Sequence, residues 1–171
     1  MAHLALPPAL AEVAALDFSS TSHGCDFEPY TKFESPEETT AWFRLYTGND
    51  AADGSQFRIF GTTGAGDYIG FWLVQPEPEM PVTAQPVVYF GSEGELSVIA
   101  RDLGDFLWML ANGSGPTEAL EEPGRVTEPN EAFCAVAEKY APGGGRATAE
   151  ILAMAKKEYP GFARYVEELC R

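Results

Sequence analysis

Carboxylates at two predicted turns are the residues whose types and spacing come closest to catalytic chemistry. Glu93 and Glu95 flank a glycine in the sequence GSEGE, and Asp67 ends the glycine-rich sequence GTTGAGD. Two carboxylates can act as general acid and general base when a pocket raises the pKa of one of them. Exposed carboxylates on turns more often face water. The pattern therefore favours solvated turns, and we predict no catalytic residue among these three.

Cys25 and His23 form the one pairing of a thiol with an imidazole in the sequence. In an extended segment the two side chains project to the same side, but a nucleophilic cysteine also needs its base to be held by a third group. No such group is evident. Metal sites normally need three or four ligands, and His3 is the one further imidazole. We therefore predict an ordinary loop, with neither a catalytic cysteine nor a metal site.

The sequence GTTGAG, residues 61–66, superficially suggests a loop that cradles phosphate. It lacks the Lys-Ser/Thr ending of a P-loop, and its glycine order differs from that of a dinucleotide-binding fingerprint. It also joins two predicted strands, whereas both of those motifs lead from a strand into a helix. Glycines that take positive φ in a hairpin turn account for the pattern, so we predict no nucleotide and no other cofactor.

The chain is strongly acidic, with 26 Asp and Glu against 11 Lys and Arg and a net charge of -15. Such a surface repels phosphate backbones and anionic lipid, so we predict that the protein binds neither nucleic acid nor membrane. Solubility alone accounts for this charge in many proteins, whereas a basic protein partner would use it to speed association. No apolar run approaches the roughly 18 residues of a membrane span, and the start lacks the basic region of a signal peptide, which predicts a cytoplasmic protein.

Two hairpins are predicted to position the turns. Residues 57–60 and 68–74 are rich in aromatic and β-branched side chains and flank GTTGAGD. Residues 86–90 and 96–100 flank GSEGE in the same way, and a proline-rich loop joins the two pairs. Four antiparallel strands in sequence order make a meander.

Helices are predicted before and after these strands in the sequence. The clearest begins at Ser35, because Ser35, Pro36 and Glu38 form a capping box, and it ends near Gly48. Its apolar stripe includes Trp42, which this spacing predicts to be a core anchor. Further helices are predicted for residues 10–17, 102–113, 133–140 and 151–169, the last divided near Tyr159, with a polar linker over residues 115–128.

The predicted fold class is α+β, with a central antiparallel β-sheet, helices packed mainly on one face and a helical C-terminal extension. The length of 171 residues is close to that of one ordinary domain. We assign residues 1–113 to the α+β domain and residues 114–171 to a helical extension packed on it.

The strands and turns resemble the SUKH superfamily. The resemblance rests on a GxGDYxGFW strand, a PVVYFGSEGE turn and a following helix with an FLxxL pattern, and it covers residues 30–113. The matching positions are Gly64, Gly66, Asp67, Tyr68, Pro86, Val87, Tyr89, Glu93, Ala100, Phe106 and Leu107. The N-terminal helix of that family is compressed here, and the chain after Gly113 does not align with it.

The resemblance implies a module that binds other proteins, used by bacterial immunity proteins that neutralise toxins and by fungal signalling scaffolds. Together with the acidic charge, it predicts an immunity protein that occludes the active site of a basic toxin domain, of nuclease or deaminase type. The predicted partner-binding residues are Asp67, Tyr68, Glu93 and Glu95, with the carboxylates taking the place of a phosphate. The alternatives are an adaptor for an endogenous protein and a small hydrolase; loss of turnover on mutating Cys25 or Glu93 would favour the hydrolase.

Overall fold

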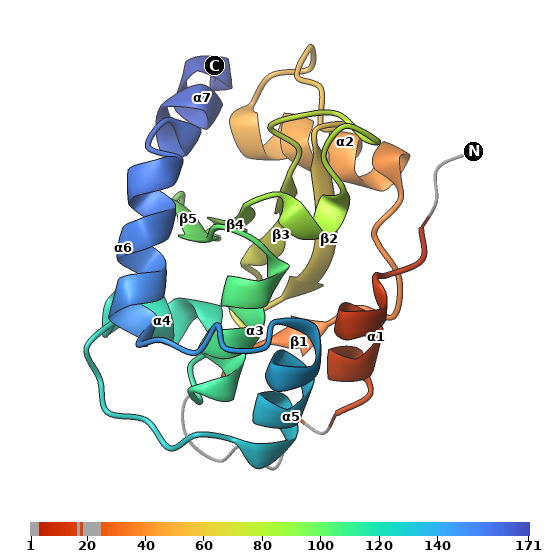
Figure 1. Cartoon of the computed structure of the whole chain (residues 1–171). Helices are drawn as coiled ribbons and strands as arrows, with labels where there is room; N and C mark the ends of the chain where they lie inside the picture. Colours follow the sequence, from red (N-terminus) through yellow and green to blue (C-terminus); the bar gives the residue numbers. More distant parts are fainter. Residues whose placement is uncertain (1–3, 17, 19–24) are drawn as a thin grey trace.

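A five-stranded antiparallel sheet lies at the centre of the protein, in a computed structural model that describes residues 4–16, 18 and 25–171 (Figure 1). The strands follow one another across the sheet in sequence order. They are β1 (Glu28–Pro29), β2 (Phe57–Thr62), β3 (Tyr68–Trp72), β4 (Val87–Phe90) and β5 (Leu96–Ala100). The predicted α+β class and the four-stranded meander are confirmed, and β1 adds a short edge strand beside β2.

Both faces of the sheet are buried, because apolar side chains occupy successive positions along its central strands. Every residue of β4 is buried. Neighbouring residues of a strand point to opposite faces, and Val87 and Tyr89 accordingly join one core cluster while Val88 and Phe90 join another. A sheet with this pattern needs helices on each side.

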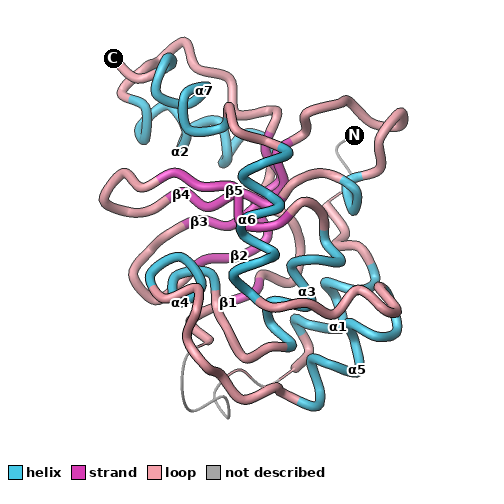
Figure 2. The backbone as a smooth tube through the Cα atoms, turned by 60° about the vertical axis from the view of Figure 1, so that its left-hand side comes forward, coloured by secondary structure: helices cyan, strands magenta, loops and turns pink. Residues whose placement is uncertain are grey.

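The helices form two layers with the sheet between them (Figure 2). On one face lie α1 (Pro8–Ala14), α3 (Leu103–Ala111) and α5 (Glu131–Tyr140); on the other lie α2 (Pro36–Thr47) and α7 (Phe162–Leu169). α6 (Thr148–Glu158) contacts β5 and contributes buried side chains to both clusters. The sequence predicted helices mainly on one face, and the structure divides them between two because the second apolar face also requires cover.

The α2 helix begins and ends where its local sequence predicts. Ser35 Oγ accepts a hydrogen bond from the Glu38 amide at 3.2 Å, and the Glu38 carboxylate accepts one from the Ser35 amide at 3.1 Å. Gly48, with a φ of 64°, ends the helix in the left-handed conformation. The helix buries Phe43 completely and leaves Trp42 half-buried on its flank.

The chain after Gly113 completes both helical layers. Residues 115–128, predicted as a linker, include α4 (Pro116–Glu121), so that prediction is wrong in part. Pro116 occupies the first helical position, where a missing amide hydrogen costs nothing. The two helices predicted to meet near Tyr159 are α6 and α7, which confirms that prediction.

The ends of α1 and α3 and the loop between the hairpins can be compared with the sequence predictions. α1 ends at Ala14 rather than near residue 17, and Asp17 lies outside the described residues. The Asp102 carboxylate accepts a hydrogen bond from the Asp105 amide at 2.9 Å and so caps α3, at the start of the predicted range 102–113. The proline-rich loop includes the single 3-10 turn η1 (Val82–Ala84) found in the described part of the chain.

Candidate protein-binding surface

Asp67, a predicted partner-binding residue, lies inside the protein. It is 3% exposed. Its Oδ2 accepts a hydrogen bond from Thr63 Oγ1 at 2.5 Å, and its Oδ1 accepts one from the Ser92 amide at 2.7 Å. Thr63 belongs to the turn between β2 and β3, and Ser92 to the turn between β4 and β5. The Asp67 carboxylate therefore ties the two hairpin turns together and offers no surface to a partner.

The surroundings of Asp67 stabilise its charged form. Burial alone would raise the pKa of this carboxyl, but hydrogen bonds with Thr63, Ser92 and Tyr89 outweigh burial and hold the pKa below its usual value. The ionised carboxylate is thus part of the folded structure, and its contribution to stability depends on pH.

We predict that Asp67→Asn lowers the free energy of unfolding at pH 7 by about 1–3 kcal/mol, because asparagine has one acceptor oxygen in place of two and cannot keep the bonds from both the Ser92 amide and the Thr63 hydroxyl. The folded pKa lies below the unfolded value of about 3.9, so the stabilisation is complete above that pH and is lost as the pH falls through the folded pKa. Urea unfolding at a series of pH values should show the two proteins converging in acid. The exposed Glu93→Gln is the control, and equal stability of Asp67→Asn and wild type at pH 7 would contradict the prediction.

Glu93 and Glu95 are exposed on the β4–β5 turn, where Gly94 takes a φ of 100°. Glu95 lies close to Tyr46 of α2: burial and then the Glu95 charge raise the pKa of Tyr46 to about 12. The Tyr46 hydroxyl donates a hydrogen bond to the Gly91 carbonyl at 3.0 Å, which fixes the ring against this turn. The turn therefore presents its carboxylates beside aromatic side chains of α2.

Four half-buried aromatic side chains pack against the second core cluster, and we call them the aromatic patch: Tyr30, Trp42, Tyr46 and Tyr68. The ring centroids of Trp42 and Tyr68 lie 4.4 Å apart, and those of Trp42 and Tyr46 lie 5.2 Å apart. Beneath them, Phe90 lies 4.9 Å from Trp42 and 5.6 Å from Tyr46. Trp42 is thus both a core contact and a surface residue, whereas the sequence predicted only the first role.

Carboxylates of the β1–α2 segment surround the Tyr30 and Tyr68 end of the patch. The pKa of Tyr30 is raised by burial and then by Tyr68, Glu34, Glu28 and Glu38. Burial, Glu34 and Glu38 raise the pKa of Tyr68 in the same way. Two tyrosine hydroxyls therefore share one region of negative potential. The sequence identified Tyr68 but missed Tyr30, Glu34 and Glu38.

Cys25 and the segment 61–66 are the described parts of the other candidate sites in the sequence. Burial, followed by the charges of Glu118 and Asp26, raises the pKa of Cys25 to about 12, so its thiol stays protonated near neutral pH. His23 and His3 lie outside the described residues. In the described ranges, no group of three or more His, Cys, Asp or Glu side chains could hold a metal ion. In the segment 61–66, the first two residues end β2 and the rest form the interstrand turn, with Gly66 at a φ of 87°.

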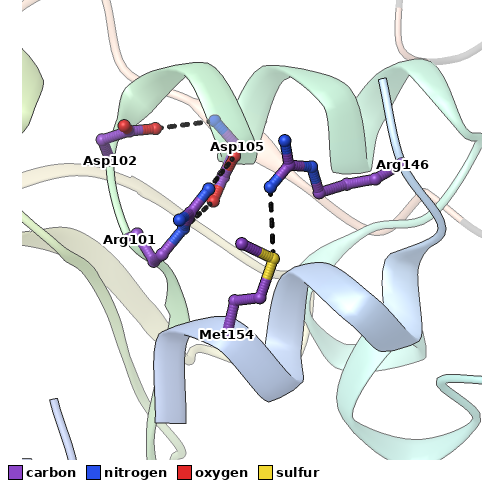
Figure 3. Close-up of polar contacts among 5 residues, drawn as sticks. All are labelled: Arg101, Asp102, Asp105, Arg146 and Met154. Atoms are coloured by element: carbon purple, nitrogen blue, oxygen red, sulfur yellow. Dashed lines mark hydrogen bonds and ion pairs between the residues drawn. The ribbon is translucent and has the colours of Figure 1, made fainter. Parts of the chain in front are cut away.

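A second set of polar contacts lies at the starts of α3 and α6 (Figure 3). Arg101 Nε donates to Asp105 Oδ2 at 2.7 Å, and Asp105 is buried. Arg146 Nη1 lies 3.1 Å from the sulfur of Met154. Each of these contacts is local to the start of one helix, and none involves a predicted binding residue. An open cleft of about 820 Å³, lined by Arg58, Trp72 and neighbouring residues, likewise contains none of them.

The fold and this surface define an α+β protein with an acidic, aromatic face on the α2 side of its sheet. Comparisons with protein-family models, with curated proteins and with solved structures find no match. The resemblance to the SUKH superfamily therefore remains a prediction from the sequence. Within the described segments, no helix is both long enough and apolar enough to cross a membrane.

Proposed function

We propose that this protein is a cytoplasmic immunity protein that binds a basic toxin domain and covers the toxin's active site. The observation that carries the proposal is the aromatic patch with Glu34, Glu38 and Glu95 around it, on a chain with a net charge of -15. Aromatic side chains dominate the binding energy of many interfaces, and half-buried rings lose little conformational entropy on binding. The patch therefore supplies affinity without any chemical step.

The carboxylates around the patch serve a different purpose. Charges at the rim of an interface mainly raise the association rate and exclude wrong partners, and they do so most at low ionic strength. A toxin that acts on nucleic acid carries a basic active site, which an acidic surface finds quickly and then blocks. An adaptor for an endogenous basic protein would use the same surface, so the two functions differ in the partner.

Co-expression tests the immunity function directly. We expect the protein to restore growth of cells that produce the toxin domain encoded beside its gene, and to co-purify with that domain. The double variant Glu34→Gln and Glu38→Gln should slow association about 3–10-fold at low salt, because it removes rim charge. Glutamine still accepts hydrogen bonds from Thr39 and Ser35, so the helix cap survives.

The matched control is Glu131→Gln with Glu138→Gln, two exposed residues of α5 in the opposite layer, which changes the net charge equally. It should leave association within about twofold. Neither rescue nor a complex with any neighbouring toxin would overturn the immunity function. Patch-dependent co-purification of an endogenous basic protein in that case would establish the adaptor instead.

A further inference from the structure

We infer that the Tyr30 and Tyr68 end of the aromatic patch binds an arginine side chain of the partner in preference to lysine. The inference rests on the proposed function, because it names the group that this surface recognises. Tyr30, Trp42 and Tyr68 supply ring faces there, and Glu34 and Glu38 supply negative charge. A guanidinium group is the cation that uses both at once.

The rings form a corner. The planes of Trp42 and Tyr68 meet at 73°, with Trp42 resting on Phe90 beneath. The main chain of Tyr30 is held against β2, because its amide donates to the Phe60 carbonyl at 2.8 Å, and its phenol lies near enough to Tyr68 for the two to interact electrostatically. A flat cation can lie against one ring while its edge faces outward from the corner. In the described chain no hydrogen bond engages the hydroxyl of Tyr30 or Tyr68, so both oxygens can accept one from a bound cation.

The two carboxylates are held in position and each keeps an oxygen free. Glu34 Oε2 accepts a hydrogen bond from Thr39 Oγ1 at 2.7 Å, and Glu38 Oε2 accepts from the Ser35 hydroxyl at 2.9 Å. No hydrogen bond among the residues described here uses the Oε1 atom of either glutamate. Both carboxylates are therefore already ordered before a ligand binds. Binding then costs less side-chain entropy, which strengthens it.

The chain does not neutralise this charge itself. Lys32 is near enough to contribute to lowering the pKa of Glu38, yet within the described structure it forms no ion pair with any carboxylate. Leu45, 84% exposed, lies one helical turn from Trp42 on α2 and offers apolar surface to the methylene stem of a long side chain. The site thus offers negative charge, aromatic rings and an apolar side chain, which together suit the guanidinium group and methylene stem of an arginine.

Arginine is favoured over lysine by the shape of the site. Its planar group presents five donors in a fixed fork, is weakly hydrated and stacks on aromatic rings. The ammonium group of lysine is a strongly hydrated point charge and loses more hydration against the rings. Charge alone would bind both equally, so the preference separates ring recognition from simple attraction.

Two acetylated peptides test the inference, one of repeated Gly-Arg-Ser and one of repeated Gly-Lys-Ser, titrated into the full chain by calorimetry at low salt. We expect the arginine peptide to bind at least about fivefold more tightly. Tyr68→Leu should abolish that preference, and Tyr68→Phe should keep part of it because the ring remains. Tyr140→Leu, on α5 in the opposite layer, is the matched control and should retain the full preference. Thermal unfolding checks that each variant is folded.

The outcomes separate this inference from the proposed function. Equal affinities for the two peptides, or no binding of either, overturn the arginine preference, while rescue in co-expression leaves the immunity function standing. A preference that persists in Tyr68→Leu also overturns it, because the rings then play no part. An arginine preference that depends on Tyr68, without rescue by any neighbouring toxin, supports this inference and removes the immunity function.

Discussion

A chain that stops after Gly113 is expected not to fold into a stable monomer, although residues 1–113 contain the whole sheet. The residues beyond it bury Phe133 and Ile151 in the first cluster and Phe162 and Val166 in the second. Burial of these four side chains contributes about 6–12 kcal/mol. Domains of this size have a net stability of about 5–15 kcal/mol. Loss of the extension therefore removes most or all of that margin.

Circular dichroism and size-exclusion chromatography measure this prediction. The truncated chain should lack a cooperative unfolding transition and should bind a dye for exposed apolar surface. Val126→Ser in the full chain is the control: Val126 is 95% exposed, so its substitution should change stability by less than about 0.5 kcal/mol. A cooperative transition of the truncated chain would instead establish residues 1–113 as an independent domain.

Phe90→Ala is expected to lower the free energy of unfolding by about 3–5 kcal/mol, the cost of truncating a fully buried phenylalanine. Phe90 is buried in β4, and its ring contacts a neighbouring strand and both helices of the layer that covers this face. Its centroid lies 4.9 Å from Trp42 of α2, 5.1 Å from Phe57 of β2 and 5.4 Å from Phe162 of α7. One cavity there weakens the contact of both helices with the sheet.

Urea unfolding of wild type, Phe90→Ala and Phe90→Leu gives the test. Leucine fills most of the space, so its cost should stay below about 2 kcal/mol. The alanine variant should also weaken binding of the arginine peptide, because Trp42 loses the ring on which it rests. A loss of stability under about 1 kcal/mol in Phe90→Ala would show that the neighbouring rings repack freely around the vacated space.

Local patterns made most of the fold predictable. The capping box at Ser35, the aspartate cap at Asp102 and the glycine turns act within a few residues, so the sequence places them well. How the helices divide between the two faces of the sheet depends on contacts between segments far apart in the sequence, so local patterns do not predict it. The uninterrupted apolar run VVYF in β4 was the available signal that both faces of the sheet are covered. A strand with one solvent-exposed face would alternate apolar and polar residues.

The binding surface was less predictable, because its residues meet only through tertiary contacts. Asp67 was expected at the surface, yet its partner Ser92 is 25 residues away on another turn, and that distant contact decides that the carboxylate points inward. Tyr30 reaches the patch through the pairing of β1 with β2, which no local pattern indicates. Trp42 and Tyr46, at i and i+4 on the flank of the α2 stripe, were the signal for a half-exposed aromatic face.

The late position of α7 in the sequence has a consequence for synthesis in the cell. All strands of the sheet are translated by Ala100, but the helix that covers Phe57 and Phe90 begins only at Phe162. At about 5–20 residues per second, the ribosome needs about 3–12 s to add the intervening chain. During that interval α2 is the one helix of the described chain available to cover this face, so we expect part of its aromatic surface to stay exposed on the nascent protein and to attract chaperones on the ribosome.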